Sequence, residues 1–190
     1  MTTPRIIVIP GSVRTGSVNA KLADAVTKAL SDKGPEVIRV SLEDYSMPIY
    51  DGNLESEKGV PANALKLGEL IAQHHGVVFV CPEYNASISP LLKNTIDWLS
   101  RNLGETKPYA NRTFALASCS PGALGGIRGL SHTRDVLVSI GADVITPQLA
   151  VGPAGDAFDD GGNLKQDRHR AILDKLCNTL IERAAYLTKG

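Results

Sequence analysis

Short apolar runs and longer amphipathic runs alternate five times along this chain, and this alternation restricts the possible folds more than any other feature. Five β-then-α units predict a parallel sheet with right-handed crossovers and helices on both faces. The predicted strands are residues 6–9, 36–42, 76–81, 113–118 and 143–151, and the predicted helices are 20–30, 62–75, 91–101, 127–140 and 167–187. We expect surface loops at 47–59 and 152–162, and a single domain over residues 1–190.

Polar loops made of small residues follow the first, third and fourth predicted strands, at 11–19, 82–85 and 118–126. In the five-stranded order 2-1-3-4-5, the first and third strands flank the point where the strand order reverses. Ligands of doubly wound sheets bind at that point, beyond the carboxyl ends of the strands. We therefore expect the three loops to converge on one site.

The first loop has the composition of an anion-binding turn. It reads GSVRTGSVN from Gly11 and leads directly into a helix, so loop and helix N–H groups are available to a negative ligand. Arg14 is its only formal charge, which suits a terminal phosphate. A nucleotide triphosphate with magnesium fits less well, because the loop lacks a Lys-Ser/Thr pair, and the dinucleotide fingerprint GxGxxG is absent. From these residues alone, an ordinary polar turn is an equal alternative.

The second and third loops suit a flat ligand. Pro82-Glu83-Tyr84-Asn85 offers a phenol ring against which a planar heterocycle can stack. The segment 120–126 contains three glycines, which allow the backbone to approach such a ligand closely. Taken singly, each of these glycines is equally explained as a turn residue.

Composition and spacing exclude several other classes of protein. The chain has 20 basic and 20 acidic residues, which argues against nucleic acid or an anionic membrane as a partner. Three cysteines without CxxC spacing, and an N-terminus too short for a signal peptide, predict a reduced, cytoplasmic protein. We expect no metal site, because His74 and His75 diverge on a helix and His132 and His169 have no partner at ligand spacing. These last two histidines are predicted at the surface, and Cys119 as a core thiol.

Three segments together resemble a known family. GSVRTGSVN, PEYNASISPLLKNTIDWLSR and SPGALGGIR are similar, in this order, to the signature loops of the NAD(P)H-dependent FMN reductases. These flavodoxin-like flavoproteins include quinone, chromate, ferric and azo-dye reductases. The resemblance extends from Arg5 to about Val151 and implies that FMN is bound by its phosphate at the first loop and by its ring between the other two. The cofactor-binding residues implied are Gly11, Ser12, Arg14, Ser17, Val18, Asn19, Pro82, Glu83, Tyr84, Asn85, Ser118, Ser120, Gly122, Gly125 and Gly126.

The resemblance also implies a mechanism. NADPH or NADH reduces the flavin, and a small-molecule electron acceptor is then reduced at the same place in a ping-pong cycle. The flavin carries the chemistry, so no catalytic side chain is expected, and for Glu83 we favour a structural or intersubunit ion pair. The family usually forms homodimers or homotetramers, here built partly from the helix at 89–101. Where many members have Pro-Gly, this chain has Ser89-Pro90-Leu91, so acceptor preference does not carry over.

Two other functions compete with this interpretation. An electron-transfer flavodoxin would bind the same cofactor without turning over NAD(P)H itself. Such carriers are expected to be acidic for steering toward basic partners, and the net charge of zero speaks against this reading. A flavin-free nucleotide-binding or regulatory domain is the third and weaker alternative.

Overall fold

The computed structural model describes residues 3–101 and 103–188, and its centre is a five-stranded parallel sheet. In space the strands follow the order β2-β1-β3-β6-β7, which is the predicted order 2-1-3-4-5 once a separate hairpin, β4–β5, is set aside. The strands of the sheet are β1 (Arg5–Pro10), β2 (Glu36–Arg39), β3 (Gly76–Val80), β6 (Thr113–Cys119) and β7 (Asp143–Val151). The hairpin consists of β4 (Glu83–Tyr84) and β5 (Ser87–Ile88).

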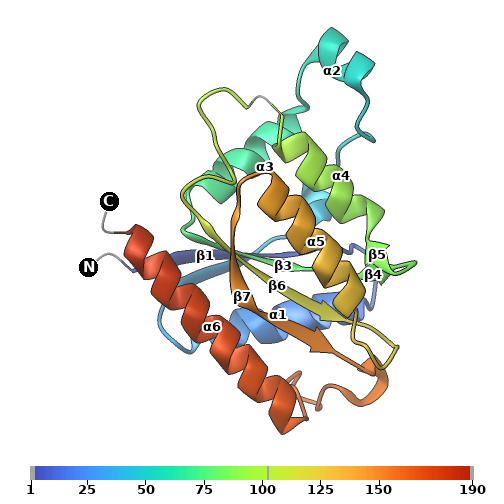
Figure 1. Ribbon diagram of the computed structural model, residues 1–190, viewed down its shortest axis with the longest axis vertical. Coiled ribbons are helices and arrows are strands. Elements are labelled where there is room, and N and C mark those ends of the chain that lie inside the picture. The colour runs from blue at the N-terminus through green and yellow to red at the C-terminus, as the bar shows by residue number, and fades with distance from the viewer. Residues whose placement is uncertain (1–2, 102, 189–190) are drawn as a thin grey trace.

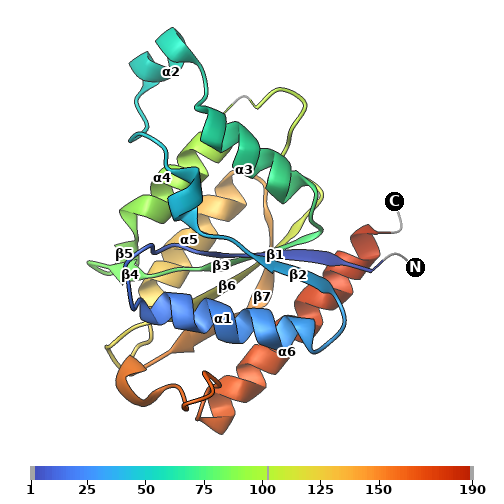
Figure 2. The ribbon, with the colours of Figure 1, turned by 180° about the vertical axis from the view of Figure 1, so that it is seen from behind.

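Helices cover both faces of this sheet (Figures 1 and 2). On one face α1 and α6 pack over one apolar cluster, and on the other α3, α4 and α5 pack over a second. The three central strands are buried almost throughout, as continuous apolar runs in parallel sheets require. The helices are α1 (Val18–Ser31), α2 (Gly52–Lys58), α3 (Ala62–Ala72), α4 (Pro90–Leu99), α5 (Ile127–Ser139) and α6 (Asp167–Leu187).

Two sequence predictions between β2 and α3 were wrong. The second strand ends at Arg39 instead of continuing to residue 42, and a short 3-10 helix follows at Leu42–Tyr45, where the Ser41 hydroxyl accepts a hydrogen bond from the Glu43 N–H. The segment predicted as a loop at 47–59 contains helix α2. Asp51 begins this helix, because its carboxylate accepts hydrogen bonds from the N–H groups at Asn53 and Leu54.

Helix α2 belongs to an arm, residues 46–60, that projects from the body of the molecule (Figure 1). The arm is anchored at its base, where the Pro48 carbonyl accepts hydrogen bonds from Asn94 and from the indole of Trp98, both on α4. Tyr50 packs edge-on against Trp98 with ring centres 5.0 Å apart. None of the residues of α2 itself is buried. The arm is therefore anchored to α4 at its base, and within the arm Glu55 of α2 accepts a hydrogen bond of 2.9 Å from the Tyr50 hydroxyl.

The outer strand β7 carries a bulge. Its pairing with β6 shifts so that Val144 lies opposite Phe114 whereas Gln148 lies opposite Leu116. Arg134 of α5 donates hydrogen bonds to the carbonyls of Val144 and Ile145, at 3.2 and 2.6 Å. A helix side chain thus satisfies backbone acceptors beside the interruption in the ladder.

Several buried polar groups complete the description of the core. Cys119 is 2% exposed, as predicted for a core thiol, and burial raises its pKa to about 12. The prediction of a surface position for His169 was wrong, because this side chain is 2% exposed near the start of α6. His132 is exposed as predicted.

Among the helices that the structure describes, none combines the length and the apolar character needed to cross a membrane.

Candidate functional site

The three polar loops lie at one edge of the sheet, because β1, β3 and β6 are parallel neighbours whose carboxyl ends point the same way. The first two loops touch at Gly11. A Cβ atom added there would lie 3.0 Å from Pro82 Cδ and 3.1 Å from Leu92 Cβ. The buried hydroxyl of Ser89 donates a hydrogen bond of 3.0 Å to the Gly11 carbonyl and also caps α4. A tight contact thus joins the first loop to the start of α4.

The N-terminus of α1 presents free donors at this edge. The helix begins at Val18, two residues earlier than predicted, and Ser17 precedes it without capping it by its side chain. Over the described part of the chain, the backbone N–H groups of Val18, Asn19 and Ala20 have no hydrogen-bond acceptor. Unpaired N–H groups and the positive end of the helix dipole together favour a bound anion.

The loop before α1 adds side-chain donors to this helix end. Arg14 is exposed, and among the described residues its guanidinium makes only a long bond of 3.4 Å to the Thr15 carbonyl. Ser12 and Ser17 are largely buried, and the one hydrogen bond of the Ser12 hydroxyl within the described residues is a long one of 3.4 Å accepted from the Arg14 N–H. One cation, two hydroxyls and three free N–H groups match the oxygen atoms of a phosphate monoester.

Asn19 has a different role from the other residues of the first loop. Its side-chain amide donates to the Cys119 carbonyl and accepts from the Cys119 N–H, both at 2.8 Å. The Asn19 side chain therefore ties the start of α1 to the end of β6, and only its backbone N–H remains available to an anion.

The second loop is a tight β-hairpin rather than a simple turn. Asn85 and Ala86 both have positive φ angles, 50° and 62°, as the two central residues of a type I′ turn require. Tyr84 is 47% exposed and Asn85 is also exposed, whereas Pro82 is buried against the first loop. The hairpin therefore presents the Tyr84 ring to solvent at the sheet edge, as stacking on a flat ligand requires.

Glu83 fastens this hairpin to α5. One carboxylate oxygen accepts hydrogen bonds from Arg128 at 2.9 and 3.2 Å, and the other accepts one of 2.9 Å from the Gly129 N–H. Desolvation is the largest single influence and raises the pKa of Glu83, but the combined bonds to Gly129 and Arg128 outweigh it, so the pKa lies below its ordinary value. Within this chain Glu83 thus forms a structural ion pair, the interpretation we favoured over a catalytic role.

The third loop packs tightly on its own chain. Gly125 and Gly126 have φ angles of 63° and 88°. A Cβ atom at Gly126 would lie 2.0 Å from the Ser118 hydroxyl, which is fully buried and has no hydrogen-bond partner in the part of the chain that the structure describes. Ser118 therefore lies beneath the loop, without exposed surface for a ligand, whereas Gly122 is exposed and Ser120 is half-buried.

Each of the three loops also exposes one large apolar side chain. Val13 is 46% exposed, Tyr84 47% and Leu124 58%. Over the described residues, no group of three or more His, Cys, Asp or Glu side chains gathers into a possible metal site. The edge therefore combines one anion-binding end with apolar surface, a combination suited to a phosphorylated aromatic molecule.

Three contributing residues were not among those predicted from the sequence: Ser89, Arg128 and Gly129. Ser89 and Arg128 lie inside the segments that carried the resemblance, but their partners are 78 and 45 residues away in the chain. The signal that points to Arg128 is a carboxylate, Glu83, in a loop expected to lie beside the helix that carries the arginine. Without the fold, that pairing could not be distinguished from many others.

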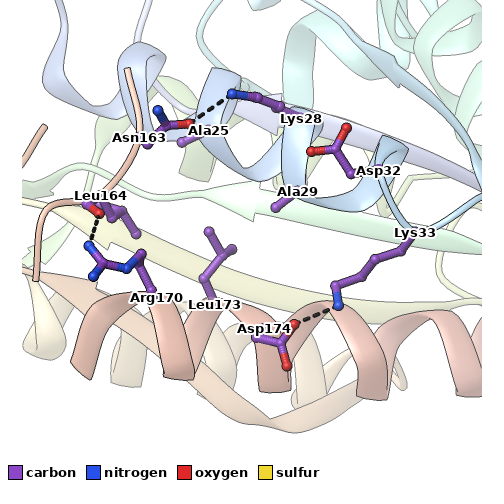
Figure 3. A pocket seen from close by; sticks show the side chains of 10 residues that line it. All are labelled: Ala25, Lys28, Ala29, Asp32, Lys33, Asn163, Leu164, Arg170, Leu173 and Asp174. Atoms are coloured by element: carbon purple, nitrogen blue, oxygen red, sulfur yellow. Dashed lines mark hydrogen bonds and ion pairs between the residues drawn. The ribbon is translucent and has the colours of Figure 1, made fainter. Parts of the chain in front are cut away.

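A cavity of about 330 Å³ lies away from these loops, between α1, α6 and the segment around Asn163 (Figure 3). Both of its lysines are already engaged: Lys28 bonds to Asn163 at 2.8 Å and Lys33 bonds to Asp174 at 2.5 Å. Arg170 donates to the Leu164 carbonyl. We assign this cavity no part in the site, because it contains no residue of the three loops.

Comparison with known proteins supports a common origin for these features. A family model described as NADPH-dependent FMN reductase matches residues 4–156. A quinone reductase of Escherichia coli strain K12 is 38% identical over 149 residues, 78% of this chain and 77% of that protein. A quinone reductase of Pseudomonas putida is 34% identical over 171 residues, 88% of each. Among solved structures, the flavoenzyme NAD(P)H:(acceptor) oxidoreductase FerB of Paracoccus denitrificans is similar, with a TM-score of 0.82 at 22% identity. The match covers 97% of this chain and 98% of FerB. This likeness confirms the flavodoxin-like fold.

Proposed function

Because this chain belongs to the NADPH-dependent FMN reductase family, we propose that it binds FMN and uses NADH or NADPH to reduce a small-molecule acceptor, with quinones as the first class to test. The observation that carries the proposal is the free anion site at the start of α1, beside an exposed tyrosine and a tightly packed glycine loop. A phosphate and a flat ring are the two parts of FMN that such a site would hold.

The residues present fit this cofactor. We assign the phosphate to Ser12, Arg14, Ser17 and the N–H groups of Val18 and Asn19, which are available in the structure. We assign the ring to the space between Tyr84–Asn85 and the exposed part of the loop at 120–126. Six further residues of the predicted set pack behind these surfaces and hold them in place: Gly11, Pro82, Glu83, Ser118, Gly125 and Gly126. When bound, FMN supplies the two-electron redox chemistry between NAD(P)H and the acceptor.

The protein then contributes position rather than acid–base catalysis. Tyr84 and Asn85 border a space in which nicotinamide and acceptor would bind in turn, which predicts ping-pong kinetics. Glu83 is held as a carboxylate by Arg128 and Gly129, so it is unsuited to donate a proton at neutral pH. Quinones fit the exposed apolar side chains of the three loops, and chromate, ferric complexes and azo compounds are further acceptors to test.

We also propose assembly into a homodimer or homotetramer. Apart from the half-buried Leu91, the large apolar side chains of α4, among them Trp98 and Leu92, are buried in the core of their own chain, so they are not free to form the contact expected of this helix. The projecting arm is the better surface, because α2 has no buried residue and Ile49 is 85% exposed. Light scattering of the native protein and of Ile49→Asp tests this, and a monomer fully loaded with FMN would refute it.

The function is tested by the visible spectrum of the purified protein, before and after anaerobic addition of NADPH. We expect a yellow protein whose extracted flavin is FMN. NADPH should bleach the yellow colour as fast as the enzyme turns over, and a quinone should restore it. Bleaching only by an external reductase would instead indicate an electron-transfer flavodoxin. Initial-rate plots at several quinone concentrations should be parallel, and intersecting plots would show that both substrates bind together.

A further inference from the structure

The hairpin β4–β5 cannot hold its own position. It has two residues in each strand, paired as Glu83 with Ile88 and Tyr84 with Ser87, and it is separate from the main sheet. Two-stranded hairpins of this size are not stable alone in water. Its turn also places Ala86 at a φ of 62°, a conformation that a residue with a Cβ atom adopts only at a cost. An outside contact must therefore order the hairpin.

That contact is the first half of helix α5. Besides the bonds from Glu83 to Arg128 and Gly129, the Ser87 hydroxyl lies 2.8 Å from His132 Nδ1. Gly129 allows the close approach, since a Cβ atom there would lie 3.2 Å from the Ser87 carbonyl oxygen and 3.3 Å from Glu83 Cα. Contacts at 128, 129 and 132 place all three residues on one side of the helix, facing the hairpin.

The same helix begins in the third loop. Gly126 is its N-cap and has no side chain with which to satisfy the N–H group of the third helical residue. The Glu83 carboxylate does this instead, by accepting from the N–H of the third helical residue, Gly129. The second loop thus caps the helix that starts in the third loop, so the position of one loop depends on the other.

We propose that Arg128 and Gly129 are positioning residues that set where Tyr84 and Asn85 stand relative to the third loop, and so the width of the space for the flavin ring and the substrate above it. This inference rests on the proposed function and extends it. The ion pair is well placed for this role, because the Glu83 side chain is 9% exposed and its carboxylate is held from both oxygens. We call the contacts of Glu83 with Arg128 and Gly129 the clamp. Over the described residues no hydrogen bond or ion pair joins Ser12, Arg14 or Ser17 to this clamp, so the anion site and the clamp can be varied separately.

The first test measures the clamp without any flavin. In the flavin-free protein, Arg128→Ala should speed amide hydrogen exchange in residues 83–88 at least tenfold, and Arg128→Lys should lie between it and wild type, because lysine keeps the charge but not the paired geometry. Arg168→Ala is the matched control, because it removes an exposed arginine on α6 that donates a hydrogen bond to Gln166 and lies outside the hairpin and α5. Unchanged exchange in Arg128→Ala would overturn the clamp.

The second test measures its effect on turnover. With saturating FMN, Arg128→Ala should lower kcat with NADPH and a quinone about tenfold while changing the Kd for FMN less than threefold. Arg14→Ala should show the opposite pattern, with a weakened Kd and a kcat restored by added FMN. Faster exchange with an unchanged kcat would overturn the positioning role. If wild type binds no FMN, the proposed function fails, and the exchange data still show whether the clamp exists.

Discussion

The first and third loops of the site both contain glycines with positive φ, but they use them in different surroundings. Gly16 in the first loop has a φ of 69°, and a Cβ atom added there would meet nothing within 4 Å. Gly125 in the third loop has a φ of 63°, and its Cβ atom would lie 2.7 Å from the Val151 backbone nitrogen. The first loop is open and its donors are free, whereas the third is packed against its own chain. The conformation of the first loop leaves its donors open to a ligand, whereas contacts within the fold fix the conformation of the third loop.

Gly125→Ala should produce the largest effect. Left-handed backbone strain and overpacking against rigid backbone together predict a loss of about 2–5 kcal/mol of unfolding free energy. Gly16→Ala is the matched control and should lose about 1–2 kcal/mol, because it carries the backbone strain without the clash. Urea denaturation of the flavin-free proteins measures both. Equal losses would break the comparison between a packed and an open loop.

Arg14→Ala should act on the ligand and not on the fold. Loss of a charge-assisted hydrogen bond predicts FMN binding weaker by about 1.5–3 kcal/mol, read from quenching of flavin fluorescence on titration. The unfolding free energy of the flavin-free protein should stay within about 0.5 kcal/mol of wild type, because Arg14 is exposed and weakly bonded. An unchanged Kd would show that Arg14 points away from the phosphate.

Glu83 should make the packed side of the site sensitive to acid. Its pKa in the folded protein is lowered, so the stability it contributes is present above its unfolded pKa and is lost as the pH falls through the folded pKa. Wild type should therefore lose more stability than Glu83→Gln as the pH falls below about 4.3, the ordinary value for glutamate. Urea denaturation over a pH series measures this. Parallel curves for the two proteins would contradict it.

Ala86→Gly should give the smallest change and in the opposite direction. Glycine relieves the strain of a positive φ but loses more conformational entropy on folding, which leaves a net gain of about 0.5 kcal/mol. Thermal unfolding of the flavin-free protein measures it. A loss of stability would indicate that the Ala86 methyl group packs on α5 closely enough to offset its strain.

The sheet could be predicted from the sequence because its signals are local. Continuous apolar runs such as 76–81, together with glycine or proline at their ends, identify the five strands of the sheet and five of the helices. Each end predicted in this way lies within three residues of the observed end. The strand order followed from a rule for doubly wound sheets, and the resemblance supplied the cofactor. Helix α2 was missed although Asp51 and Gly59 flank it as cap and stop, because its seven residues include a single large apolar side chain, Leu54, and so give no apolar period.

Which polar residues of the site contact a ligand and which hold the fold could not be predicted in the same way. Asn19, Ser118 and Glu83 are polar residues in or beside loops, and nothing in their neighbours separates a ligand contact from a structural one. For Asn19 and Glu83 the difference arises from partners far along the chain, Cys119 and α5 respectively, and for Ser118 it arises from the close packing of Gly126 over its hydroxyl. Only the packed fold brings these partners together.

At high protein concentration, the exposed edges of a sheet decide whether one chain can join the next by strand pairing. The edge at β2 is only four residues long, Glu36–Arg39. The edge at β7 is longer, but the bulge breaks its regular spacing and Pro147 within it has no N–H to offer. A strand of a second chain could therefore pair only with a short edge at β2 or an interrupted edge at β7. The irregularity of β7 thus disfavours aggregation by edge-to-edge strand pairing.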